Sequence, residues 1–129
     1  MDEDRFHRYL AGALELGASD LHFKPGAPPA FRLAGQLRPA REDRLAPADT
    51  RDICEFVLAG SAEEVDLDAV RDLDTSYALP GRCRFRVNIF RQRGSLSLVL
   101  RVIPEKIPTF ADLELPPQTR ELAGFTRGL

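Results

Sequence analysis

The amino-acid sequence predicts an α+β domain in which an antiparallel sheet is covered by helices on one face. Apolar residues recur at helical spacing in the first part of the chain and again around residue 53, while two runs of three segments show strand-like alternation. Short turns join the predicted strands within each run, which favours antiparallel pairing and hence the α+β class. Such a sheet buries one face under helices and leaves the other free.

The first predicted helix and strands occupy residues 6–38. Helical spacing of apolar residues from Phe6 to Leu14 predicts a helix, and we expect Gly17 to end it. Alternation around Leu21 and Phe23 predicts a half-buried strand. Two short strands, 31–33 and 36–38, are expected to form a hairpin through Ala34–Gly35.

Two helices are expected between the two runs of strands. Pro47 suits the first turn of a helix whose apolar stripe includes Ile53 and Val57, although no Ser or Thr cap precedes the proline. Ser61 followed by Glu64 resembles a capping box, which predicts another helix running through Val70.

The second run contains the strongest strand signals. We expect strands at 74–79, 84–89 and 95–102, with turns at Pro80–Gly81 and Arg93–Gly94. Prolines at 104 and 108 should end the sheet, and short helices are expected from residue 109 and over 116–122.

Composition narrows the possible functions. A chain of 129 residues suits one domain, and a net charge of −2 gives no reason to expect nucleic acid as a partner. No apolar run approaches the ~20 residues of a membrane span, and the acidic start does not resemble a signal peptide. Cys54 and Cys83 lack metal-type spacing, so we expect reduced thiols and no metal site.

The most informative stretch is the arginine-rich strand near residue 86. Strand alternation places Arg84 and Arg86 on the face opposite Phe85 and Val87, and the neighbouring strand adds Arg101 to the same face if the apolar faces align. Guanidinium groups bind phosphate bidentately. Periodicity alone favours a solvated face paired with acidic residues, and a phosphate site is the other possibility.

Several motifs, in order and covering nearly the whole chain, resemble one family. They are Gly17–His22, Pro28–Pro29, Arg32–Gly35, Leu73–Tyr77, Gly81–Phe90, Leu100–Pro104 and Thr126–Leu129. Together they are similar to the N-terminal domain of PilT-type twitching-motility ATPases, the pilus retraction motors of the type II/IV secretion ATPase superfamily.

The resemblance implies a PAS-like domain over residues 1–103 and a short helical linker over 104–129. In the family this linker leads into a RecA-like ATPase domain with a phosphate loop, G-x-x-x-x-G-K-[ST], and the sequence contains no Gly-Lys-Ser/Thr. The end at Leu129 is therefore expected to be a cut between two domains. By itself the fragment should be no enzyme and need no cofactor, whereas the parent would be an ATPase using ATP and Mg.

The resemblance also implies roles for individual residues. In such hexameric motors the N-terminal domain closes over ATP and contributes arginines to its phosphates. By position Arg86 and Arg101 are the first candidates, and Arg84 and Arg91 come next. Asp20 and His22 belong to a motif that we interpret as structural, because no nucleophile accompanies His22.

The implied partners are the RecA-like domains of the same and neighbouring subunits of a homohexamer, and the platform protein of the pilus machine in the inner membrane. This places the protein in the cytoplasm, peripheral to the inner membrane and without membrane insertion. Two alternatives stay open: a sensor that binds a cyclic dinucleotide, and a module that docks onto a partner of a secretion ATPase. The motifs fit a retraction motor best, but an accessory retraction ATPase or a secretion ATPase remains an alternative.

Overall fold

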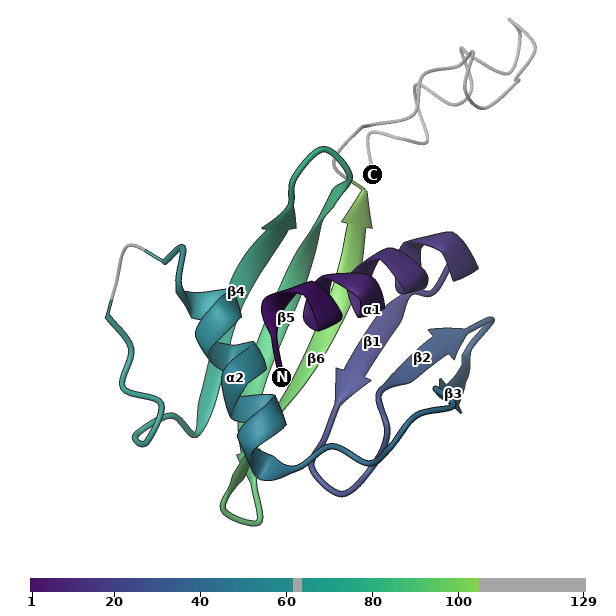
Figure 1. Cartoon of the computed structure of the whole chain (residues 1–129). Helices are drawn as coiled ribbons and strands as arrows, with labels where there is room; N and C mark the ends of the chain where they lie inside the picture. The colour runs from purple at the N-terminus through teal and green to yellow at the C-terminus, as the bar shows by residue number, and fades with distance from the viewer. Residues whose placement is uncertain (62–63, 105–129) are drawn as a thin grey trace, which may run out of the picture.

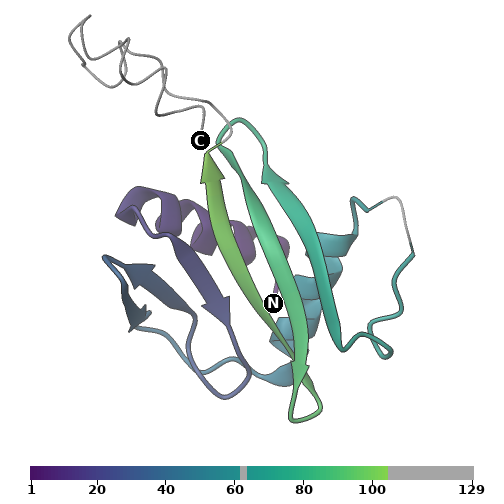
Figure 2. The same ribbon diagram turned by 180° about the vertical axis from the view of Figure 1, so that it is seen from behind.

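The computed structural model describes residues 1–61 and 64–104. It contains two helices and six strands: α1 (Glu3–Leu16), β1 (Asp20–Phe23), β2 (Ala30–Leu33), β3 (Gln36–Pro39), α2 (Pro47–Leu58), β4 (Asp72–Leu79), β5 (Cys83–Gln92) and β6 (Ser95–Pro104). The strands form one sheet in the order β3-β2-β1-β6-β5-β4, with every neighbouring pair antiparallel. Both helices lie on the same face of this sheet, which confirms the predicted α+β class (Figures 1 and 2).

Helix α1 ends at Gly17 as predicted and begins at Glu3, three residues before the predicted apolar stripe. The carboxylate of Asp2 accepts a hydrogen bond from the backbone N–H of Arg5 at 2.7 Å, which caps the first turn. Gly17 ends the helix in the left-handed conformation, with φ at 71°. The buried side of α1 carries Phe6 and Leu10, which face the sheet.

Strand β1 joins the two halves of the sheet. It pairs with β2 on one side and with β6 on the other, so residues near position 20 lie beside residues near position 100. The β2–β3 hairpin turns through Ala34 and Gly35, both with positive φ, as a two-residue hairpin turn requires.

Helix α2 starts without a side-chain cap at Ala46. The carboxylate of Asp49 instead accepts a hydrogen bond from the Ala46 N–H at 2.8 Å, and Pro47 occupies the first turn. Ile53, Cys54 and Val57 are buried on the side that packs against the sheet.

The helix predicted from Ser61 through Val70 is wrong for the described part of that segment. Residues 64–70 contain a turn at 67–69 and no helix. The Asp66 carboxylate accepts a hydrogen bond from the N–H of Asp68 at 3.0 Å, and such a local bond competes with helix formation. The carbonyl of Val70 accepts a hydrogen bond from the side chain of Arg91, and that of Leu67 accepts one from Arg91 in addition to the 3.4 Å turn bond from the N–H of Val70.

Strands β4, β5 and β6 form a continuous antiparallel meander that is longer than predicted. The β5–β6 connection consists of Arg93 and Gly94, with φ of 54° and 78°. Positive φ at both positions gives the turn type whose twist matches that of the flanking strands.

The core lies between the sheet and the two helices. Every second residue of β5 from Cys83 to Ile89 is buried there, together with Leu98 and Leu100 of β6. Fully burying each large apolar side chain stabilises the fold by about 1.5–3 kcal/mol. This packing leaves the alternate residues of the same strands on the face that carries no described helix.

The predicted C-terminal helices and most of the 104–129 linker lie outside the described residues. Neither described helix is long and apolar enough to cross a membrane.

Candidate functional site

A row of side chains crosses all six strands on the face opposite the helices. The strand register places in this row, from β3 to β4, Leu37, Arg32, Asp20, Arg101, Arg86 and Ser76. Three guanidinium groups and one carboxylate leave the row with a net charge of plus two. Figure 2 views the sheet from this face.

The predicted shared face of Arg84, Arg86 and Arg101 is confirmed. Arg86 and Arg101 are direct partners across β5 and β6, while Arg84 lies two residues along β5 and pairs with Ile103. All three are exposed. Neither Arg84 nor Arg86 forms an ion pair with any residue in 1–61 or 64–104.

Asp20 anchors the row from its centre, although the residue is only 4 % exposed. Its Oδ1 accepts a hydrogen bond from Arg101 Nε at 3.0 Å, and its Oδ2 lies 3.5 Å from Arg32 Nε. The hydroxyl of Ser19 donates a further hydrogen bond at 2.9 Å. Burial acts to raise the pKa of Asp20, but the hydrogen bonds from Ser19 and Arg101 outweigh it and lower the pKa.

A shallow groove of about 280 Å³ opens beside the two opposed arginines. Arg86 and Arg101 line it together with Asp74, Asn88 and Val99. The Asn88 amide donates to the Asp74 carboxylate at 3.1 Å, and also to that of Asp72, which fixes the acidic side of the groove. The arginine side is therefore the part with unpaired donors for an anion.

Arg91 is placed away from the other predicted arginines. It projects on the same side of β5 as Val87 and Ile89, opposite to Arg86. Its guanidinium donates to three backbone carbonyls, those of Val70 at 2.9 Å, Leu67 at 2.5 Å and Gly94 at 2.9 Å. The side chain thus ties the segment before β4 to the sheet.

His22 shares the uncovered face with Asp20. It lies between Ala30 of β2 and Val99 of β6 and is half-buried. Burial, followed by the nearby charge of Arg32, lowers its pKa, so the ring is neutral at physiological pH. A structural role for the Asp20–His22 motif remains our prediction.

The described residues contain no cluster of side chains that could bind a metal ion. Within 1–61 and 64–104, no three His, Cys, Asp or Glu side chains come together as a metal site. Cys54 and Cys83 are both buried and form no disulfide within the described residues. Burial raises the pKa of the Cys54 thiol to about 12, which makes it a poor nucleophile.

Comparison with known proteins identifies relatives along almost the whole chain. The type IV pilus ATPase PilU of Pseudomonas aeruginosa is 36 % identical over 126 residues, which is 96 % of this chain and 32 % of PilU. The type IV pilus retraction ATPase PilT of the same organism is 31 % identical over 93 % of this chain and 35 % of its own length. No protein-family model matches the chain.

A solved structure supports the same relationship. The crystal structure of the pilus retraction motor PilT with bound ADP superimposes with a TM-score of 0.68 at 39 % identity, covering 89 % of this chain and 34 % of that one. The chain therefore spans about a third of the length of the relatives it matches. By sequence and by fold, this chain is homologous to the type IV pilus ATPases PilU and PilT and resembles the N-terminal domain of PilT.

Proposed function

We propose that this domain is the lid of a motor ATPase, and that it closes over ATP held by a RecA-like domain with Arg86 and Arg101 contacting the phosphates. The observation that supports this proposal is the pair of guanidinium groups directly opposed on an uncovered sheet face. The two cations repel, because Arg86 has no ion pair among the described residues and Arg101 shares the single charge of Asp20 with Arg32. A phosphate group that accepts hydrogen bonds from both arginines offsets that repulsion.

The two arginines would act differently. Arg101 is held at its Nε by Asp20, while its side chain stays 68 % exposed, so its terminal amino groups remain free for a ligand. Arg86 has no ion pair among the described residues and can reorient. We therefore assign Arg101 as the fixed contact and Arg86 as the mobile one, with Arg84 as an outer positive charge.

Arg91 has a different assignment in this proposal. Its guanidinium already donates to three carbonyls, and it projects from the opposite face of β5. A phosphate contact would require breaking those bonds, so we assign Arg91 to the stability of the lid.

The wider setting is also proposed. The relatives are ATPases of type IV pili, and the parent of this domain would be a homohexamer that uses ATP and Mg. Residues 1–103 would form the lid, and 104–129 would link it to the ATPase domain. The assembly would work in the cytoplasm, against a platform protein at the inner membrane.

ATP turnover by the full-length ATPase that carries this domain tests the phosphate contacts. Arg86→Ala and Arg101→Ala should each reduce turnover about tenfold or more, because charge stabilisation in a closed site is lost. Arg82→Gln is the matched control, since Arg82 is exposed in the β4–β5 turn, away from the groove. Unchanged turnover in both alanine variants would exclude this function.

A sensor of cyclic dinucleotides predicts a different result. The groove is open in the chain as it stands, so a sensor would bind cyclic di-GMP tightly without any ATPase domain. Tight binding that is lost in Arg86→Ala would favour the sensor over the lid.

A further inference from the structure

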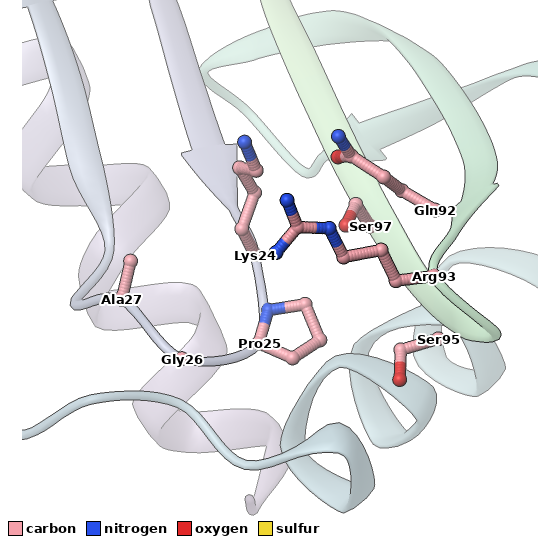
Figure 3. Close-up of a pocket in the computed structure, with 8 residues that line it drawn as sticks. All are labelled: Lys24, Pro25, Gly26, Ala27, Gln92, Arg93, Ser95 and Ser97. Atoms are coloured by element: carbon pink, nitrogen blue, oxygen red, sulfur yellow. The ribbon is translucent and has the colours of Figure 1, made fainter.

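A second pocket on the uncovered face lies between the end of β1 and the β5–β6 turn. It has a volume of about 360 Å³ and is lined by two segments distant in sequence, 24–27 and 92–97. Figure 3 shows the Arg93 side chain extending across this pocket toward Lys24. Ser97 is four residues, roughly 13 Å, from Arg101 along β6, and the pocket shares no lining residue with the Arg86–Arg101 groove.

The lining of this pocket is cationic and contains no carboxylate. Lys24 and Arg93 supply the charges, and Gln92, Ser95 and Ser97 supply polar groups. Neither Lys24 nor Arg93 forms an ion pair with any described residue. Two unpaired cations that line one pocket raise its affinity for an anion.

Ser97 provides a polar group at depth. It is 2 % exposed although it lies on the face without helices, and its hydroxyl makes no hydrogen bond with another described residue. No side-chain polar atom of the described residues is both fully buried and without a hydrogen-bond partner, so the Ser97 hydroxyl reaches the surface of the pocket, where it can donate to a ligand oxygen.

The backbone around the pocket is fixed. Gly26 N–H donates to the carbonyl of Leu45 at 2.8 Å, and Leu45 N–H donates to Ala27 at 2.9 Å, which ties the loop after β1 to the segment before α2. On the other side, Arg93 belongs to the two-residue turn between β5 and β6. The cations are therefore attached to two firmly held segments, which lowers the entropic cost of binding.

We propose that this pocket binds a phosphate group, with Lys24 and Arg93 as its cationic contacts and Ser97 as a hydroxyl donor. Phosphate offers more oxygens and more negative charge than a carboxylate to donors that converge from two sides. The site is separate from the groove assigned to the nucleotide and does not depend on the lid function. The phosphate can be free or carried by a nucleotide, and the experiment distinguishes these sources.

Amide chemical shifts of the 129-residue chain, measured by NMR during titration at constant ionic strength, test the site. The probes are inorganic phosphate, ADP and acetate. Saturable shifts at Lys24, Gly26 and Ser97 are expected with phosphate or ADP. Lys24→Gln and Arg93→Gly should each weaken that binding about tenfold, because one charge-assisted contact is lost.

The variants are chosen so that the fold is retained. Position 93 has a positive φ, which glycine adopts without strain, and Lys24 makes no side-chain bond to a described residue. Arg82→Gln removes an equal charge at the opposite end of the sheet and should leave binding unchanged. Shifts with ADP alone assign the phosphate to a nucleotide, and shifts with inorganic phosphate assign a free anion. Equal shifts with acetate, or unchanged binding in both pocket variants, would overturn the proposal.

Discussion

Arg101 donates a hydrogen bond through Nε to Oδ1 of Asp20 at 3.0 Å, and this contact connects two strands that are 81 positions apart in sequence. Asp20 also lies 3.5 Å from Arg32, so one buried carboxylate holds guanidinium groups on both neighbouring strands. The Nε of Arg101 is thereby held in place, while its terminal amino groups stay exposed.

Replacing Asp20 by Asn should destabilise the domain. The substitution keeps the shape but removes the charge that orients Arg101 and Arg32. Because both arginines can reach solvent, the expected loss in the free energy of unfolding is about 1–2 kcal/mol rather than the full cost of an isolated buried charge. Urea unfolding followed by circular dichroism measures it.

The control for this prediction is Asp43→Asn. Asp43 is exposed and has no ion pair with a described residue, so its change should stay within about 0.5 kcal/mol. Equal effects of the two substitutions would mean that Asp20 does not anchor the row.

The contribution of Asp20 should depend on pH in a defined direction. Its pKa is lowered from 3.8 in the folded protein, so its stabilising effect is complete above that value and is lost as pH falls through the folded pKa. The difference in unfolding free energy between wild type and Asp20→Asn should be largest at about pH 7 and shrink as the pH falls through the folded pKa of Asp20. A difference that grows on acidification would contradict the assignment.

Local alternation was enough to predict the arginine face. The period of two along β5 separates Arg84 and Arg86 from Phe85 and Val87, and the two-residue turn at Arg93–Gly94 fixes which residue of β6 faces Arg86. The alternation and the turn lie within about 20 residues of each other, so the shared face can be predicted without knowing the order of the other strands.

The partner of Arg101 could not be predicted in this way. Pairing of β1 with β6 brings Asp20 beside Arg101, and that choice of neighbours is made by the packing of the whole sheet rather than by a local pattern. The position of Arg32 in the row likewise depends on the pairing of β1 with β2. Likewise, the capping-box pattern at Ser61 predicts a helix through Val70, but two carbonyls of that segment, those of Leu67 and Val70, accept hydrogen bonds from Arg91. A local helix pattern does not contain these distant bonds.

Arg91→Ala should destabilise the domain more than any other single arginine substitution discussed above. Three hydrogen bonds from a charged donor are lost, so the carbonyl of Val70 loses its partner and that of Leu67 keeps only the 3.4 Å bond from the N–H of Val70. We expect a loss of about 2–4 kcal/mol in the free energy of unfolding. Lys at this position should restore only part of it, because one ammonium group cannot reproduce the planar fork of donors. A loss below about 0.5 kcal/mol would show that these bonds do not hold the segment.

The two cysteines should be unreactive in the folded domain. Both are buried, and the pKa of Cys54 is raised to about 12 by burial, so almost no thiolate is available to an alkylating reagent at about pH 8. Labelling followed by mass spectrometry should show no modification of the native chain and modification of both thiols in denaturant. Rapid labelling without denaturant would indicate that the core around α2 opens readily.

Arg86→Ala should leave the stability of the domain unchanged. Arg86 is exposed, forms no ion pair with a described residue and faces the like charge of Arg101, so its removal costs no contact and relieves a repulsion. We expect a change in the free energy of unfolding within about 0.5 kcal/mol, in the stabilising direction if any. Arg101→Ala, which breaks the bond to Asp20, serves as the comparison and should destabilise. If Arg86→Ala proves as stable as wild type, a loss of ATP turnover in the full-length protein reports a lost contact with the ligand. A clear loss of stability would instead show that Arg86 stabilises the sheet.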